Sequence, residues 1–236
     1  MAKELSKLTG KTILSYHLTD KAKSSGFENL ICPIVINKVK SHGKKIIFEF
    51  DNQLMIVSLG MSGRFQYEEG KHSHVQFKFD NLILYYEDSR RFGKLVINDN
   101  KKSYLSKLGP CLLTHALDQP ISKKQWRQLY KPKLLKRKIA DILLDQSIVS
   151  GMGLYLMTDI LYWSKINPLR IGNTITKKEL ECIRVNAHKV VFSAYEGNGL
   201  TIKNYLLPSQ KKGVYETAIY GKKKDANGYH NLITLF

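Results

Sequence analysis

Long hydrophobic runs are missing from this sequence. No segment approaches the roughly 18 continuous apolar residues that a membrane-spanning helix requires. The opening residues, MAKELSKLTGKT, also lack the apolar centre of a secretory signal. We therefore expect a protein that does not act at a membrane and that stays inside the cell.

Cysteine is scarce as well, because the 236 residues include only Cys32, Cys111 and Cys182. An odd number of widely separated cysteines argues against a disulfide framework and against a Cys-x-x-Cys zinc site. We expect the three thiols to be reduced and structural.

Acidic residues are few, since 20 Asp and Glu stand against 38 Lys and Arg, for a formal net charge of +18. A chain this basic, with a sequence pI near 9.7, has a polyanion as its natural partner, and nucleic acid leads that class. The 43% hydrophobic content still suffices for one large core or two modest ones. We expect two main domains.

Short apolar stretches separated by Gly, Asn, Asp and Ser fill the first half of the chain and predict β-strands. Alternation of apolar and polar residues, as in HVQFKF at 74–79, indicates a sheet with one face in water. The first half is therefore predicted to be an antiparallel β-domain, arranged as a sandwich. The expected strands lie within residues 11–18, 31–40, 44–50, 54–60, 74–79, 82–88 and 94–99.

The spacing of apolar residues becomes helical in the second half of the chain. Helices are expected within residues 123–146, 154–166 and 177–197. The segment between the halves, 108–122, carries two prolines and is interpreted as a linker. The predicted architecture is therefore an α+β multidomain chain, a β-sandwich followed by helices.

The segment LLDQSIVSGMGLYLMTDIL, at 143–161, predicts two helices joined by a turn that contains Gly151 and Gly153. Glycine permits positive φ and close backbone approach, and the first N–H groups of a helix have no partner within that helix. A phosphate oxygen can supply that partner, assisted by the helix dipole. The alternative is an ordinary helical hairpin whose glycines only make the turn. The basic composition favours phosphate binding.

Four short motifs occur in one order along the chain. They are HGKK at 42–45, LGMSGR at 59–64, EDSRRFG at 87–93 and LLDQSIVSGMG at 143–153, supported by LGP at 108–110 and INP at 166–168. From Gly10 onward, this pattern resembles the formamidopyrimidine-DNA glycosylase and endonuclease VIII family. The resemblance implies a base-excision repair glycosylase with AP lyase activity, which flips out oxidised bases and removes them through an amine Schiff-base intermediate.

The resemblance also implies a domain arrangement. A β-sandwich is expected at 1–115, a helix-two-turn-helix domain at 122–207 and a short finger at 208–236. Residues 220–228 match the zincless hairpin of the endonuclease VIII-like branch, with Asn227-Gly228 as its turn. No zinc and no other cofactor is therefore expected.

The resemblance assigns roles to individual residues. Lys44 matches a lysine on a hairpin that reaches DNA near the damaged nucleotide. Met61, Arg90 and Phe92 match the residues that fill the gap left by the extruded nucleotide, with Arg90 on the orphaned base. Without the resemblance, Lys44 is a solvated turn lysine, and Met61 and Phe92 are core residues.

Further contacts are expected beside these. Asp88 is predicted to brace its loop, and Arg91 to contact the DNA backbone. Leu154 stands where the family has a phosphate-holding asparagine, so phosphate binding is expected from the backbone N–H groups of Gly151, Gly153 and Leu154. The expected partner is DNA, duplex or single-stranded, with oxidised bases or abasic sites, bound by a monomer.

The start of the sequence departs from the family pattern. The family's nucleophile is an N-terminal proline followed by a glutamate, whereas this sequence begins Met1-Ala2-Lys3-Glu4. Neither role is transferred, and Ala2, Lys3 and Lys44 are considered as substitute amines. A lysine serves only when unprotonated, which burial or like charge favours. The alternative function is a homologue that binds lesions in DNA but lacks the nucleophile and does not cleave.

Overall fold

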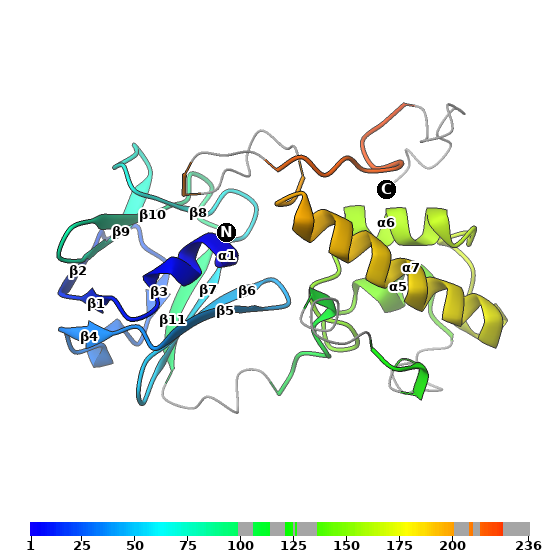
Figure 1. The fold of residues 1–236 in the computed structure, drawn as a ribbon, viewed down its shortest axis with the longest axis horizontal. Coiled ribbons are helices and arrows are strands. Elements are labelled where there is room, and N and C mark those ends of the chain that lie inside the picture. Colours follow the sequence, from blue (N-terminus) through cyan, green and yellow to red (C-terminus); the bar gives the residue numbers. More distant parts are fainter. Residues whose placement is uncertain are drawn as a thin grey trace. The chain divides into compact units, whose positions relative to one another are not determined.

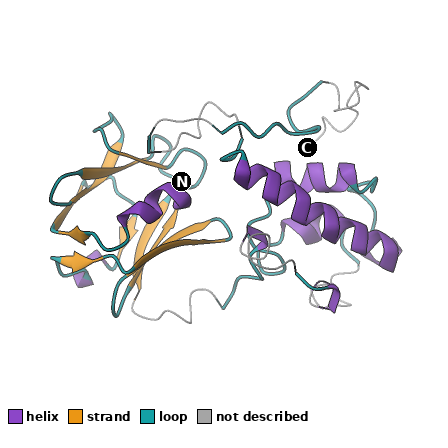
Figure 2. Ribbon diagram, in the orientation of Figure 1, coloured by secondary structure: helices purple, strands orange, loops and turns teal. Residues whose placement is uncertain are grey.

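The computed structural model describes residues 1–98, 106–113, 121–124, 126, 136–200, 208–209 and 213–223. These residues form two compact units (Figure 1). The first contains Met1–Ser106 and the second Lys107–Leu200, and the shorter stretches beyond Leu200 divide between them. Strands build the first unit and helices the second (Figure 2). The predicted class, a β-sandwich followed by a helical domain, is confirmed, while the exact boundaries at 115, 122, 207 and 208 stay predictions.

The first unit is a sandwich of two sheets. Its strands are β1 (Thr12–Ile13), β2 (Ser15–Leu18), β3 (Ser24–Ser25), β4 (Ile34–Val35), β5 (Lys38–His42), β6 (Lys45–Glu49), β7 (Leu54–Ser58), β8 (Arg64–Gln66), β9 (Ser73–Lys78), β10 (Ile83–Glu87) and β11 (Lys94–Asn98). The smaller sheet has the order β2-β9-β10-β8, and the larger has the order β3-β11-β7-β6-β5. All these pairings are antiparallel except that of β3 with β11. Strands β1 and β4 form a separate pair.

Aromatic rings fill much of the space between the two sheets. Phe48 packs edge-on against Phe65, with 5.8 Å between ring centroids, and Phe65 packs in the same way against Tyr86 at 5.4 Å. On the other face of the larger sheet, Ile47 and Ile56 are also no more than 1% exposed. Strands β6 and β7 are therefore buried on both faces, whereas the alternating stretch at 74–79 exposes Lys78 and buries Val75 and Phe77.

Two of the expected strands are each divided in the structure. Residues 11–18 first pair with β4 and then, beyond Leu14, with β9, because the chain passes from one ladder to another. Residues 31–40 are likewise shared by β4 and β5. Strand β8 has no counterpart among the expected strands, since it is three residues long and too short to show alternation.

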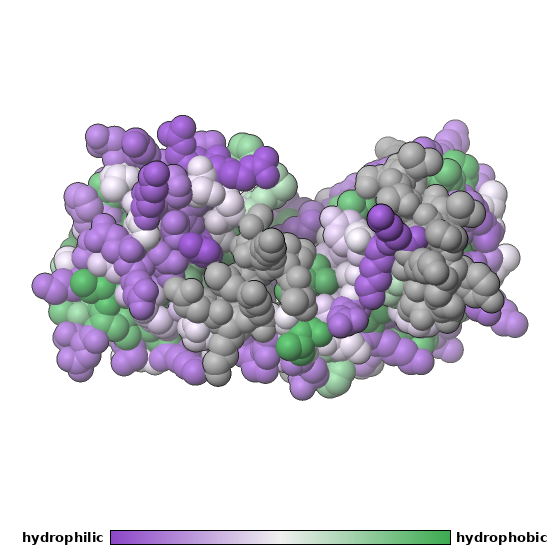
Figure 3. All heavy atoms as spheres, turned by 90° about the horizontal axis from the view of Figure 1, so that it is seen from above, coloured by the Kyte–Doolittle hydropathy of each residue, from purple (hydrophilic) through white to green (hydrophobic). Residues whose placement is uncertain are grey.

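Helices build the second unit. They are α5 (Ile139–Leu144), α6 (Leu154–Trp163) and α7 (Lys177–Glu196), with a 3-10 turn, η3 (Gly172–Thr174); the first unit carries α1 (Ala2–Leu5), η1 (Ser6–Leu8) and η2 (Phe27–Asn29). Residues Ile183, Ala187 and Val191, at helical spacing on α7, are buried in one core with α5 and α6. Within the described ranges, none of the helices has the length and apolarity to cross a membrane. Hydrophilic side chains cover most of the described surface on the face drawn in Figure 3.

Residues 108–113 belong to the helical unit. The Gly109 N–H donates to the Gln146 carbonyl at 2.9 Å, and the Ser150 N–H donates to the Pro110 carbonyl at 3.0 Å. The linker interpretation is therefore wrong for this part, because Gly109 and Pro110 are hydrogen-bonded to the turn between α5 and α6. Parts of three expected elements lie outside the described residues. They are 114–120 of the expected linker, 127–135 of the first expected helix and 224–228 of the expected hairpin.

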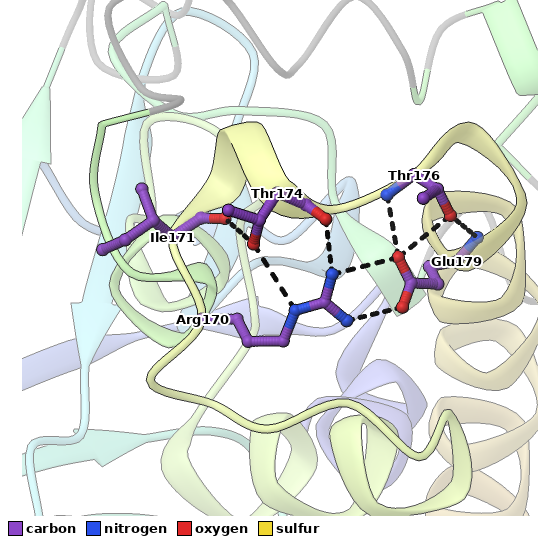
Figure 4. Close-up of polar contacts among 5 residues, drawn as sticks. All are labelled: Arg170, Ile171, Thr174, Thr176 and Glu179. Carbon is purple, nitrogen blue, oxygen red and sulfur yellow. Dashed lines mark hydrogen bonds and ion pairs between the residues drawn. The ribbon is translucent and has the colours of Figure 1, made fainter.

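Helix α7 begins with a capping box that an arginine reinforces (Figure 4). The Thr176 hydroxyl accepts a hydrogen bond from the Glu179 N–H at 3.2 Å, and the Glu179 carboxylate accepts one from the Thr176 N–H at 2.8 Å. Arg170 donates to both carboxylate oxygens of Glu179 and to the Thr174 carbonyl. The pairing with Arg170 is the main reason that the pKa of Glu179 falls to about 2.

Glu179→Gln should destabilise the helical unit only where Glu179 is ionised. Glutamine retains the capping geometry, and the lost pair with Arg170, whose side chain is 33% exposed, is screened by solvent and contributes little. A carboxylate with a depressed pKa stabilises the fold above its ordinary pKa of 4.5 and loses that contribution as the pH falls toward about 2. Urea unfolding across this range should show the difference between the two proteins shrinking, and a pH-independent difference would contradict the pairing.

Candidate nucleic-acid interface

The strand register brings three of the motif-bearing loops to the same end of strands β6, β7 and β11 in the larger sheet. Ser58, at the end of β7, is paired with Lys45 of β6 on one side and with Lys94 of β11 on the other. The hairpin before Lys45, the loop after Ser58 (59–63) and the loop before Lys94 (88–93) therefore all leave the sheet from one row. Motifs that lie far apart in the sequence are thus neighbours in the fold.

Two of these loops run from one sheet to the other. Loop 59–63 leads from β7 to β8, and loop 88–93 leads from β10 to β11. Where they meet the smaller sheet, Arg64 and Glu87 are ladder partners. Arg64 donates to Glu87 Oε2 from Nε at 3.1 Å and from Nη2 at 2.8 Å. This two-pronged pair fixes one end of each loop.

The three residues predicted to fill a gap in DNA lie together on these loops, and we call Met61, Arg90 and Phe92 the wedge. Met61 is 56% exposed and Phe92 is 55% exposed, so the alternative of two core residues is wrong. The Arg90 guanidinium carbon lies 4.8 Å from the centroid of the Phe92 ring, and Arg90 Nη1 lies 4.0 Å from the Met61 sulfur. Exposed apolar side chains beside a cation suit insertion between stacked bases.

Asp88 braces its own loop, as the motif predicted, and also the loop 59–63. Its side chain is 1% exposed and accepts hydrogen bonds from the Ser62 hydroxyl of one loop and from the Gly93 N–H of the other, the latter at 2.7 Å. The Ser62 oxygen in turn accepts a hydrogen bond from the Arg90 N–H at 3.1 Å. The wedge is therefore held by a buried, charge-assisted network rather than by its own packing.

Two glycines allow the loops this close approach. A Cβ at Gly93 would lie 1.8 Å from the Tyr86 hydroxyl oxygen, and a Cβ at Gly60 would lie 2.9 Å from the carbonyl carbon of Phe92. Gly60 also has φ +63°, where side chains are disfavoured. Burial and the neighbouring Asp88 raise the pKa of Tyr86, so its phenol stays neutral. The glycines of both motifs are thus required for space.

Arg91 and Lys44 are exposed in the same unit. Arg91 has φ +55°, which is uncommon for a residue with a side chain, and its N–H donates to the Asp88 carbonyl at 3.2 Å. Lys44 lies in the β5–β6 hairpin, where desolvation lowers the pKa of its amine. Ala2 and Lys3 lie on α1 of this unit. The DNA-contacting and catalytic roles of these residues stay predictions.

In the second unit, Gln146 closes the turn between α5 and α6, a role that sequence interpretation missed. Its amide nitrogen donates to two carbonyls of the turn, both at 2.9 Å, and its amide oxygen accepts from the Gly151 N–H at 3.0 Å. Gly151 has φ +99°, as the predicted glycine turn requires. The Gly151 N–H is thus used within the turn, where Gly151 supplies the left-handed backbone conformation. Gly153 and Leu154 open α6 with the N–H groups that have no partner in the helix, and their phosphate-binding role stays a prediction.

A second missed residue, Asp159, is fully buried in α6. Its carboxylate accepts hydrogen bonds from the Tyr215 hydroxyl at 2.8 Å, the Ala218 N–H at 3.0 Å and the Ile219 N–H at 3.3 Å. Burial raises the pKa of Asp159, and these three hydrogen bonds oppose the rise. Asp159 thereby attaches the segment 214–223 to α6. The available signal was an acidic residue within a run of apolar helical positions.

Comparison with known proteins supports the motif assignment. A family model described as "Formamidopyrimidine-DNA glycosylase N-terminal domain" matches residues 1–95, and one described as "Formamidopyrimidine-DNA glycosylase H2TH domain" matches residues 112–205. A formamidopyrimidine-DNA glycosylase of Wolbachia pipientis subsp. Culex pipiens (strain wPip) is 31% identical over 227 residues, 90% of this chain and 80% of that protein. The chain belongs to the formamidopyrimidine-DNA glycosylase family.

Solved structures of this glycosylase family share the fold. The MutM (Fpg) protein from Thermus thermophilus matches with a TM-score of 0.83 and 25% identity, over 93% of this chain and 84% of that one. A Lactococcus lactis Fpg, solved with DNA that contains an abasic site, matches with a TM-score of 0.81 and 26% identity, over 94% of this chain and 85% of that one. The predicted family and fold are confirmed, while the endonuclease VIII-like branch stays a prediction.

Proposed function

We propose that this protein is a DNA glycosylase of base excision repair that also has AP lyase activity. Its substrate is DNA that contains oxidised bases or abasic sites. The observation that carries the proposal is the wedge, whose exposed side chains are held by glycine-bearing loops and by the buried Asp88. The Lactococcus lactis Fpg of the same fold, solved with abasic-site DNA, supports the same class of partner.

The wedge serves the extrusion of the damaged base. An enzyme that acts on a base within a duplex must first take it out of the stack, at a cost of about a few kcal/mol. Met61 and Phe92 enter the gap and replace the lost stacking. Arg90 donates hydrogen bonds to the orphaned base. Arg91 and the N–H groups that open α6 hold phosphates and fix the register on the DNA.

Excision then requires an unprotonated amine that attacks C1′ of the extruded nucleotide. The base leaves, the amine forms a Schiff base with the opened sugar, and β-elimination releases the 3′ phosphate. Lys44 is our candidate amine, because its motif matches the hairpin lysine that reaches DNA in the family and its hairpin leaves the sheet beside the wedge loops. Desolvation lowers the pKa of its amine, as it does that of Lys45. Ala2 and Lys3 are the alternative amines.

Borohydride trapping on duplex DNA with an abasic site tests both the activity and the amine. The wild-type protein should yield a covalent adduct. Lys44→Arg keeps the positive charge but forms no Schiff base, so it should retain DNA binding and lose the adduct. Lys45→Arg, at the neighbouring lysine, is the matched control and should retain both.

Other outcomes of this experiment contradict parts of the proposal. An undiminished adduct in Lys44→Arg that maps to Ala2 or Lys3 would move the role to that amine. Tight binding by the wild-type protein with no adduct would favour the non-cleaving alternative. That alternative is not favoured by the relatives, since the Wolbachia protein is named as a glycosylase.

We also propose that the protein works without zinc, as in the endonuclease VIII-like branch. The three cysteines are free, and the residues that the structure describes include no cluster of three or more metal-ligating side chains. Dialysis against EDTA should therefore leave the thermal midpoint, DNA binding and adduct formation unchanged, and elemental analysis of the untreated protein should find no stoichiometric zinc. A loss of binding that added zinc restores would contradict this proposal.

A further inference from the structure

Among the described methionines, Met61 alone has a largely exposed side chain. Of the five methionines, Met61 is 56% exposed, Met55, Met152 and Met157 are 1%, 0% and 2% exposed, and Met1 is partly buried against the sandwich core. Oxidation of a thioether by peroxide follows its exposure. Met61 is therefore the methionine that a peroxide reaches first.

We propose that Met61 is a site of reversible oxidation to methionine sulfoxide, and that oxidation removes the preference of the protein for damaged DNA. The second part rests on the proposed function. In the reaction, the sulfur attacks one oxygen of hydrogen peroxide, an S=O bond forms, and the O–O bond breaks. The second oxygen takes up the proton of the first and leaves as water. Sulfur loses two electrons and the peroxide gains them.

The contact with Arg90 makes this oxidation consequential. Arg90 Nη1 lies 4.0 Å from the Met61 sulfur, and a sulfoxide oxygen is a far better acceptor than a thioether sulfur. The oxidised side chain therefore competes with an orphaned base for the Arg90 guanidinium. A sulfoxide must also lose its hydration before it enters stacked bases, which opposes insertion. Oxidation thus disables two of the three residues of the wedge.

The test uses the full chain, treated with hydrogen peroxide and then with catalase. Peptide mass spectrometry measures the sulfoxide at each methionine over time. Fluorescence anisotropy measures dissociation constants for a duplex with a stable abasic-site analogue and for the same duplex without damage. Met61→Leu is the matched control, because it has similar size, lacks the sulfur and retains all three cysteines.

Met61 should be oxidised before Met55, Met152 and Met157. The preference of the wild-type protein for the damaged duplex should then fall about tenfold, as expected for one apolar side chain that no longer inserts. Methionine sulfoxide reductases A and B together should restore the preference. Met61→Leu should show the same preference before and after peroxide.

Three results would overturn the proposal. They are equal oxidation of Met61 and the buried methionines, an unchanged preference after complete oxidation of Met61, and a loss of preference in Met61→Leu, which would assign the sensitivity to cysteine. Failure of the proposed function gives a different result, because the untreated protein would then bind both duplexes equally. In that case the peptide map still shows whether Met61 oxidises first.

Discussion

Alanine in place of Gly93 should remove most of the preference of the protein for damaged DNA. Its Cβ would lie 1.8 Å from the Tyr86 hydroxyl oxygen and 2.8 Å from the Ser58 carbonyl oxygen, so the loop must move. That movement breaks the 2.7 Å hydrogen bond from the Gly93 N–H to Asp88 and displaces the wedge. Overpacking of this kind costs about 1–3 kcal/mol of stability, and we expect the preference to fall by about tenfold or more.

Dissociation constants for a duplex with an abasic-site analogue and for the undamaged duplex measure this effect. Ser89→Ala, at an exposed position of the same loop, is the control and should bind as the wild type does. Adding Tyr86→Phe to Gly93→Ala removes the closest clash and should restore part of the preference, since the contact with Ser58 remains. If Gly93→Ala binds with unchanged preference, the loop does not position the wedge.

The sandwich was predictable because most of its strands carry their own local signal of apolar residues between turn formers, although the short β8 does not. Which strands lie side by side carries no such signal. The row that pairs Ser58 with Lys45 and Lys94 joins residues from three separate segments, and it explains why the motif loops leave the sheet together. The two-sided burial of β6 was also hidden, because Ile46-Ile47-Phe48 reads equally well as a strand with either face inside.

The candidate site was predictable to the extent that it consists of motifs. Met61, Arg90 and Phe92 follow from their motifs, and the structure brings them together. Asp88 was predicted from its motif, but Gln146 and Asp159 were missed because most of their partners are main-chain groups, which every residue offers. Gln146 bonds within six residues of itself, so a local signal existed. The partners of Asp159 lie 56 to 60 residues away, and only the folded chain reveals them.

Removing the Asp159 carboxylate should cause the largest loss of stability in the helical unit. Asp159→Ala leaves the Tyr215 hydroxyl and the N–H groups of Ala218 and Ile219 without their acceptor. Each buried donor left unsatisfied costs about 1–3 kcal/mol. The variant also avoids the desolvation of a buried carboxylate, which offsets part of the loss. Because Ala218 and Ile219 are only 6% and 4% exposed, water cannot readily replace the acceptor, and we expect a net loss of about 3 kcal/mol.

Urea unfolding followed by circular dichroism measures this loss, with Asp141→Asn as the control that removes the same charge from an exposed helical position. Asp159→Asn should lie between the two, because its amide keeps one acceptor oxygen but places an N–H₂ group opposite other donors. Since the carboxylate holds the segment 214–223, cleavage by trypsin after Lys222 or Lys223 should accelerate in Asp159→Ala before global unfolding begins. Equal stability of Asp159→Ala and Asp141→Asn would show that the three donors find other partners and that Asp159 does not anchor this segment.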